Sequence, residues 1–247
     1  MRWRPAATTE RSIASVPKVG IAALVVAFAL HITWQALEPR AQAAGAALPL
    51  PPSAAALRVA SLGDPIALAQ ALTLYLQAFD NQPGMSIPYQ ELDYGAVLAW
   101  LKAILSLDPR SQYPLMMAAQ LYAQVPDEAK TRRMLAFVHE EFLRAPDERW
   151  RWLAHAALVA KHRLRDMPLA LRYADEITSK ARSALGWARQ MRIFILEDMG
   201  ESHAAAVLLG GLLESGEVAD TAEIRFLTER LEKLKADEIS TFPSKSR

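Results

Sequence analysis

Residues 115–122 have the sequence LMMAAQLY, and residues 152–159, which lie 37 positions later, have the sequence WLAHAALV. In each stretch the first, fourth, fifth and eighth positions fall on one face of a helix, because a helix completes a turn every 3.6 residues. Those positions hold Leu, Ala, Ala and Tyr in the first stretch and Trp, His, Ala and Val in the second. The spacing predicts two helices that bury equivalent faces.

The same interval recurs elsewhere in the chain. Pro109 and Pro146, each expected to end a helix, are also 37 residues apart. A further step of 37 leads to Arg189, Arg192, Ile193 and Leu196, and an alternative register uses Trp187, Met191 and Phe194. The recurrence predicts a degenerate helical repeat rather than a single helix pair.

A helix-turn-helix unit of this length resembles the tetratricopeptide repeat, in which large, small and aromatic positions alternate and a proline closes the unit. The resemblance covers about residues 93–215 and is best in the unit that contains Leu115 and Tyr122. It implies antiparallel helix pairs stacked as a short solenoid, with a groove that receives a segment of another protein. An irregular helical bundle with coincidental spacing is the alternative.

The rest of the chain after residue 64 also has helix periodicity, with Asp or Ser at expected helix starts and Gly or Pro at expected ends. The fold class is therefore all-α, and no segment predicts a strand. The loop 81–93 is long and contains apolar residues that either plug the start of the solenoid or contact a partner. Helices are expected over residues 66–79, 93–107, 112–124, 127–143, 147–162, from 166 to beyond 177, 185–199, 202–213 and 220–236.

The N-terminal part predicts a membrane anchor. Residues 1–18 are basic, and residues 19–37 form an apolar run of nineteen residues, just long enough to cross a hydrocarbon core as a helix. The positive-inside rule then places the N-terminus in the cytoplasm and the remainder in the periplasm or another extracytoplasmic space. The residues expected to contact lipid include Val19, Leu24, Phe28, Leu30 and Trp34.

A cleaved signal peptide is the competing interpretation, because Ala41-Gln42-Ala43 has the small-x-small form of a cleavage site. Both interpretations export the helical domain. Residues 38–65 are rich in Pro and Ala and predict a semi-stiff linker before the helical domain of residues 66–236. Residues 237–247 are polar and predict a flexible tail.

Composition narrows the function. The chain has no cysteine and a net charge of +1, which disfavours thiolate chemistry and a nucleic-acid partner. His139-Glu140-Glu141 lacks the second histidine that a metalloprotease helix needs, because residue 143 is Leu. We therefore expect no catalytic residues, no metal and no cofactor.

Aromatic and basic side chains are the candidate partner-binding residues. Tryptophans are common at the centres of protein interfaces, and arginines cluster near one expected helix end. The competing interpretation makes the tryptophans core wedges and the arginines a solvated helix terminus. The candidates are Trp150, Trp152, Arg163, Arg165, Trp187, Arg189 and Arg192.

These features favour a membrane-anchored scaffold of the cell envelope that binds a protein partner. A structural subunit that uses its membrane helix, with His31, Thr33 and Gln35 in the contact, is one alternative. An envelope enzyme is the other, with acidic candidates Glu140, Glu141, Asp147 and Glu148.

Overall fold

The computed structural model describes residues 17–37, 46–82, 85–216 and 218–241 of the 247-residue chain. The predictions for the basic N-terminus, the cleavage site near Ala43 and the end of the tail lie outside the described residues, apart from their boundary positions. The described residues divide into two units, of which the first contains helix α1 (Lys18–Leu37) and the second contains all the other helices.

Helix α1 matches the predicted apolar helix, and its described side chains, from residue 17 to residue 34, are exposed. Among the described residues no single helix has both the length and the apolar composition expected of a membrane span. The bent pair α2 (Ala54–Ala60) and α3 (Pro65–Ala78), with an angle of 111° at the break, meets that expectation only when the two helices are taken together.

The second unit begins within the predicted linker. Ser53 caps α2, and Leu57 of that helix is 3% exposed. Leu48 is also buried in the main core, and Trp100 donates a hydrogen bond from Nε1 to the Pro49 carbonyl at 2.7 Å. Residues assigned to the linker by their Pro and Ala content therefore cover the first helices of the domain.

Aspartates begin four of the helices, as the sequence predicts. Asp64 caps α3, Asp93 caps α4 (Tyr94–Leu107), Asp127 caps α6 (Glu128–Arg144) and Asp166 caps α8 (Met167–Lys180). Each carboxylate accepts a hydrogen bond from a backbone N–H of the first turn, which would otherwise lack a partner.

The connection between α3 and α4 differs from the prediction of an irregular loop. It contains a hairpin of two-residue strands, β1 (Asn81–Gln82) and β2 (Met85–Ser86), followed by a 3₁₀ turn, η2 (Tyr89–Glu91). These two short strands form the only sheet among the described residues, so the fold class remains helical.

The helix predicted over residues 112–124 is the largest local difference. Its start is the short helix α5 (Tyr113–Met116), and it continues as a π-helical segment, η3 (Met117–Leu121), and a 3₁₀ turn, η4 (Tyr122–Gln124). The hydroxyl of Tyr94 donates to the Tyr122 carbonyl at 2.8 Å, and Thr131 Oγ1 donates to the Ala123 carbonyl at 3.2 Å. Side chains from neighbouring helices thus satisfy carbonyls at the end of this irregular segment.

The remaining helices agree closely with the predicted ranges, except that the last one extends to Thr241 and so includes residues 237–241 of the predicted flexible tail. They are α7 (Pro146–His162), α9 (Gly186–Asp198), α10 (Ser202–Glu214) and α11 (Thr221–Thr241). Helix α11 does not begin with a closed capping box, because Glu223 Oε1 accepts from Gln190 Nε2 at 2.7 Å instead. Asp220 nevertheless caps the helix by accepting from the Ala222 and Glu223 N–H groups.

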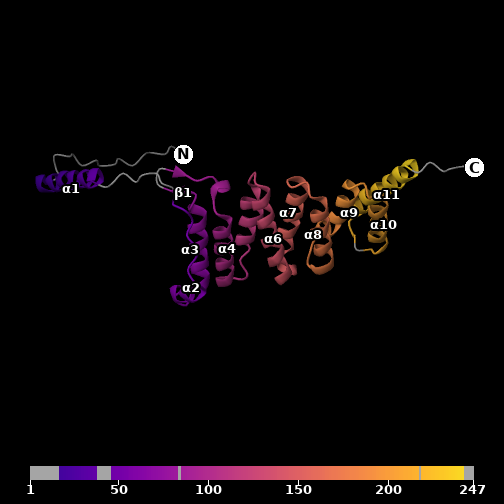
Figure 1. Cartoon of the computed structure of the whole chain (residues 1–247), viewed down its shortest axis with the longest axis horizontal. Helices are drawn as coiled ribbons and strands as arrows, with labels where there is room; N and C mark the ends of the chain where they lie inside the picture. The colour runs from indigo at the N-terminus through magenta and orange to yellow at the C-terminus, as the bar shows by residue number, and fades with distance from the viewer. Residues whose placement is uncertain (1–16, 38–45, 83–84, 217, 242–247) are drawn as a thin grey trace, which may run out of the picture. The chain divides into compact units, whose positions relative to one another are not determined.

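Helices of the second unit pack against their neighbours in chain order (Figure 1). Buried residues from α2 to α9 form one core cluster, and a second cluster joins α9, α10 and α11 through Ile193, Leu209 and Leu227. Each helix therefore hides its apolar side against the helices that precede and follow it. This is the sequential pairing that the 37-residue spacing predicts.

A buried ion pair joins α6 to α7, and its arginine also contacts the chain just beyond α4. Arg149 of α7 donates from Nη1 to Glu141 Oε2 at 2.6 Å and to the Glu141 carbonyl at 2.8 Å, and both side chains are almost fully buried. Its Nη2 donates to the Pro109 carbonyl, just beyond α4, at 2.8 Å. One guanidinium thus links α6, α7 and the end of α4.

Removal of the Glu141 carboxylate should destabilise the fold strongly, because it leaves Arg149 buried without its counter-charge. We expect Glu141→Ala to lower the free energy of unfolding by about 3–5 kcal/mol in chemical denaturation of the full chain in detergent. The neighbouring Glu140, paired with Lys102 in an exposed ion pair, is the matched control. Glu140→Ala should cost less than about 1 kcal/mol, and equal losses for the two variants would contradict this account.

Candidate functional site

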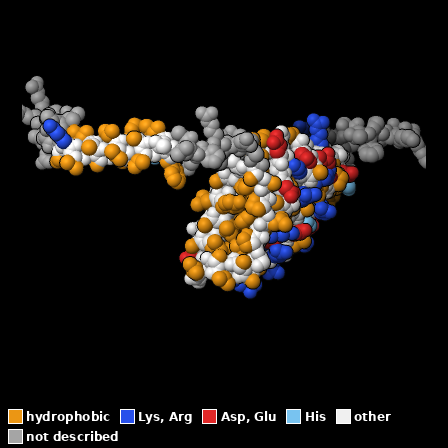
Figure 2. Space-filling view, turned by 60° about the vertical axis from the view of Figure 1, so that its left-hand side comes forward, with side chains coloured by type: hydrophobic (Ala, Val, Ile, Leu, Met, Phe, Trp, Pro, Cys, Tyr) orange, Lys and Arg blue, Asp and Glu red, His pale blue; other side chains and the backbone are white. Residues whose placement is uncertain are grey.

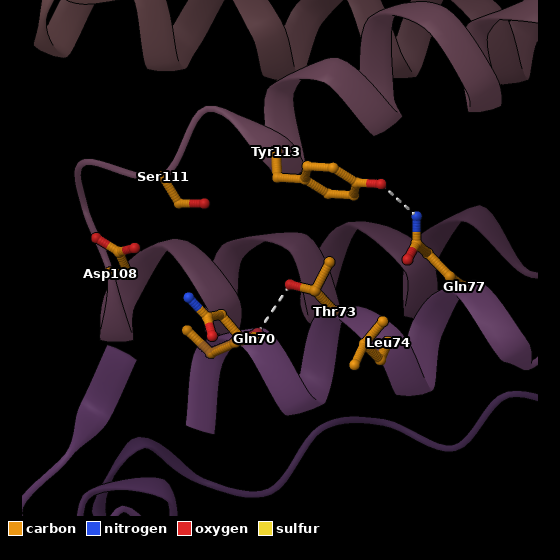
Figure 3. Close-up of a pocket in the computed structure, with 8 residues that line it drawn as sticks. Gln70, Thr73, Leu74, Gln77, Asp108, Ser111 and Tyr113 are labelled. Atoms are coloured by element: carbon orange, nitrogen blue, oxygen red, sulfur yellow. Dashed lines mark hydrogen bonds between the residues drawn. The ribbon is translucent and has the colours of Figure 1, made fainter. Parts of the chain in front are cut away.

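A cavity of about 490 Å³ lies between α3 and the chain that leads into α5 (Figure 3). Gln77 of α3 donates from Nε2 to the Tyr113 hydroxyl at 2.9 Å, which bridges the two sides. Tyr113 is 43% exposed, so its ring is accessible from solvent. The lining consists of Ala69, Gln70, Thr73, Leu74, Gln77, Asp108, Ser111 and Tyr113.

Local hydrogen bonds hold this lining in place. Thr73 Oγ1 donates to the Ala69 carbonyl within α3, and Asp108 accepts from the Arg110 N–H in the turn after α4. Within the described part of the chain, the side chains of Gln70 and Ser111 make no hydrogen bond, although both line the cavity. The cavity therefore offers amide and hydroxyl groups that can donate to and accept from a ligand.

Contacts of the same kind continue from helix to helix. Gln112 Oε1, beside Tyr113, accepts from Trp152 Nε1 of α7 at 2.7 Å. The ring of Trp150 meets the ring of Trp187 of α9 edge to face, with centroids 5.6 Å apart. We call these three separate pairs together the first-helix row, which comprises Gln77, Gln112, Tyr113, Trp150, Trp152 and Trp187.

The row combines aromatic surface with uncharged polar groups. Amide and hydroxyl groups pair with the main chain of an extended polypeptide, and aromatic rings supply apolar contact at small entropic cost. Among the described residues no group of three or more His, Asp or Glu side chains could hold a metal ion. The arrangement is suited to recognition of a polypeptide segment.

The three predicted tryptophans lie in this row with different exposures. Trp150 is 4% exposed and therefore packs in the core, which agrees with the core-wedge interpretation. Trp152 is half-buried, and Trp187 is 51% exposed. Partner binding by these side chains stays a prediction, and Trp187 is the tryptophan best placed for it.

The predicted arginines are not gathered at the tryptophans. Arg163 is eleven residues beyond Trp152 along the α7 direction, about 16 Å of helix, and donates to the Val125 carbonyl at 3.2 Å. Arg165 is exposed in the turn after α7, in the left-handed conformation with φ 52°. Arg189 and Arg192 line a separate cavity of about 250 Å³ beside α10, and Arg192 lies 3.8 Å from Asp175.

Sequence reasoning missed Gln77, Gln112 and Tyr113. The available signal is the repeat interval, since Gln77 and Tyr113 are 36 residues apart and Gln112 and Trp152 are 40 apart. Residues one repeat apart occupy equivalent places on adjacent helices, so polar or aromatic pairs at this separation are candidates for contact.

The histidine that begins the incomplete metalloprotease motif has a structural partner. His139 Nε2 lies 3.0 Å from both carboxylate oxygens of Glu176, and its ring lies 5.2 Å from the ring of Tyr173. Burial acts to raise the pKa of Glu176, but hydrogen bonds from Lys180 and His139 outweigh it and hold that pKa below its ordinary value. His139 thus links α6 to α8.

The comparisons found no matching family model, no similar curated protein and no similar solved structure. The architecture itself therefore defines the class of protein. It is a helical protein whose helix pairs pack sequentially, with a polar and aromatic row across their first members.

Acidification should weaken the fold through His155, which follows Trp152 by three residues. Its Nε2 is buried and has no partner among the described residues, and burial lowers its pKa below the ordinary value of about 6.5. The unfolded chain then binds a proton more readily, so stability is lost as the pH falls through about 6.5.

In His155→Leu, which has the residue expected at this repeat position, that component of the pH dependence should be absent. Chemical denaturation of the full chain in detergent, followed by fluorescence between about pH 7.5 and 5, measures it. If wild type and variant lose stability in parallel over this range, the assignment to His155 is wrong.

Proposed function

We propose that the protein is a membrane-anchored scaffold of the cell envelope that binds a segment of a partner protein along the first-helix row. The observation that supports this most directly is that one side-chain pair links each helix of the row to the next. Hydrogen bonds and ring contacts connect α3, α5, α7 and α9 at separations of 36 to 40 residues, beside an open cavity. The pattern favours tetratricopeptide-like units.

The anchor proposal rests on α1. The helix is twenty residues long and follows a basic segment, and its described side chains are exposed and almost all apolar. Such a surface is stable in lipid and costly in water. In this proposal the N-terminus is cytoplasmic and the helical domain extracytoplasmic, and cleavage near Ala43 remains the alternative.

Three of the four acidic candidates have structural partners, which favours a binding function over catalysis. Glu140 pairs with Lys102, Glu141 with Arg149, and the Asp147 carboxylate accepts from the Ser183 N–H at 2.8 Å. These carboxylates serve helix contacts in the described fold. We therefore propose no catalytic residue and no cofactor.

The binding proposal is tested with a photo-cross-linking residue placed at Gln70 in the cavity or at Leu185, which is exposed beside Trp187. Irradiation of membranes from the source cell should give an adduct with the same partner from both positions. Trp187→Ala should then reduce the Gln70 adduct about tenfold, because an exposed tryptophan at an interface commonly contributes that much affinity.

Phe226 provides a matched control, since it is 53% exposed on α11 and does not belong to the first-helix row. A cross-linker at this position should give no adduct with the partner, and Phe226→Ala should leave the Gln70 adduct unchanged. Adducts of equal yield from all three positions, or none from Gln70 and Leu185, would refute binding along the row.

The alternative function is a structural subunit whose α1 contacts other membrane helices. Thr33 Oγ1 donates to the Ala29 carbonyl of the same helix at 2.8 Å, so its hydroxyl is already satisfied within α1. Replacing α1 with an unrelated membrane helix separates the two functions. The scaffold keeps its cross-linked partner after this exchange, whereas the structural subunit loses it.

A further inference from the structure

The N-terminal end of the second unit has an exposed apolar surface on α2 and α3. On α3 it follows positions 0, 4, 7 and 11, which share one side of a helix. Figure 2 shows hydrophobic side chains gathered over this end, with charged side chains over the rest of the visible face. We call it the N-terminal apolar face, comprising Val59, Leu62, Ala67, Ala71, Ala78 and, at its border with the cavity lining, Leu74.

Helix α3 is apolar on both sides. Its opposite stripe contains Ala69 and Leu76, each 2% exposed and packed in the core. No residue of α3 is charged, and α2 has only Arg58. The polar residues of α3 are Gln70, Thr73 and Gln77, which line the cavity. A helix with an apolar side opposite its core side normally covers that second side as well.

The C-terminal end of the helix series, formed by α11, has a charged surface rather than an apolar one. The outer side of α11 is rich in charge, as expected for the last helix of a stack that ends in water. Its exposed charged residues include Arg225, Glu229, Glu232, Lys233 and Lys235. The contrast indicates that the N-terminal end is covered by something other than water.

Leu62, in the turn between α2 and α3, is exposed and has an unfavourable backbone conformation. Leu62 has φ 47°, in the left-handed region that bulky side chains rarely adopt, and it is 94% exposed. Val59, one turn earlier, is 77% exposed. No contact in the described fold requires an apolar side chain at Leu62, so a contact outside the chain explains it best.

The chain that joins α1 to the second unit limits what can cover this face. The second unit is fixed from Ala46, whose N–H donates to Gln82 Oε1 at 2.8 Å and whose carbonyl accepts from Gln82 Nε2 at 3.0 Å. Only residues 38–45 separate this point from the end of α1, which allows at most about 30 Å. Gln82 follows α3, which is itself about 21 Å long.

We propose that the N-terminal apolar face docks on the lipid bilayer in which α1 is anchored. This proposal rests on the proposed membrane anchor. Val59 and Leu62 enter the boundary between headgroups and acyl chains, and Arg58 extends its guanidinium to the headgroups. The series of helix pairs then begins at the bilayer surface, and the first-helix row extends away from it.

Because the chain has no cysteine, single cysteines can carry an environment-sensitive fluorophore at chosen positions. Full-length Leu62→Cys and Ala71→Cys are labelled and reconstituted into vesicles of phosphatidylcholine and phosphatidylglycerol, with or without acyl-chain spin-labelled lipid. Both labels should be strongly quenched by the spin label. Val207→Cys is the matched control, since Val207 is 61% exposed on α10, and its label should remain unquenched.

A variant with two glutamates on the N-terminal apolar face distinguishes docking of this face from anchoring by α1. The variant Leu62→Glu/Ala71→Glu, labelled through Ala78→Cys, should still float with the vesicles through α1 but lose quenching at residue 78. The Ala78→Cys protein without the glutamates should remain quenched. Circular dichroism verifies that both proteins keep the same helix content.

The outcomes distinguish the two proposals. Failure of the full chain to float with vesicles overturns the membrane anchor, and docking with it. Flotation without quenching at residues 62 and 71 overturns docking alone. A second copy of the chain is the other candidate to cover the face. In that case unlabelled Leu62→Cys residues of two chains would form a disulfide, and a label at residue 71 would be shielded from water but not quenched by spin-labelled lipid. This result would overturn docking on the bilayer.

Discussion

Burial of apolar helix sides against neighbours in the chain is the constraint on which the rest of the structure depends. The helices from α3 to α11 pack mainly against elements close to them in the chain, α2 packs against α4, and no helix in the described part is surrounded by all the others. Each helix pair consequently leaves one side uncovered. The candidate binding surface is built from those uncovered sides, so the packing that stabilises the fold also creates the row.

Polar contacts fix how successive helices align, and they recur at the repeat interval. Lys102 with Glu140, His139 with Glu176, and Arg230 with Glu197 join helices at separations of 33 to 38 residues. The ends of the series have contrasting chemistry, since α11 is highly charged outside and α3 is apolar outside. In the proposed docking on the bilayer, this difference between the ends corresponds to a lipid-facing start and a water-facing end.

The predicted helices depended on local chemistry and agreed well with the structure. Asp64 and Asp166 cap their helices through their own carboxylates, which is a property of a few adjacent residues. The irregular segment after α5 depends instead on Tyr94 and Thr131, which are distant in sequence, so helix periodicity at residues 115–122 gave no sign of it. The tryptophans of the row could be predicted, because tryptophan is common at protein interfaces. Its glutamines could not, because in the sequence they look like ordinary surface residues and only the structure reveals their partners.

Native-state hydrogen exchange of the full chain in detergent tests neighbour-to-neighbour burial most directly. If stability is a sum over adjacent helices, α10 and α11, whose core cluster is separate from the main one, should open at a lower free energy than α6, α7 and α8. A single opening free energy shared by every helix from α3 to α11 would contradict the account, because it would require one cooperative core.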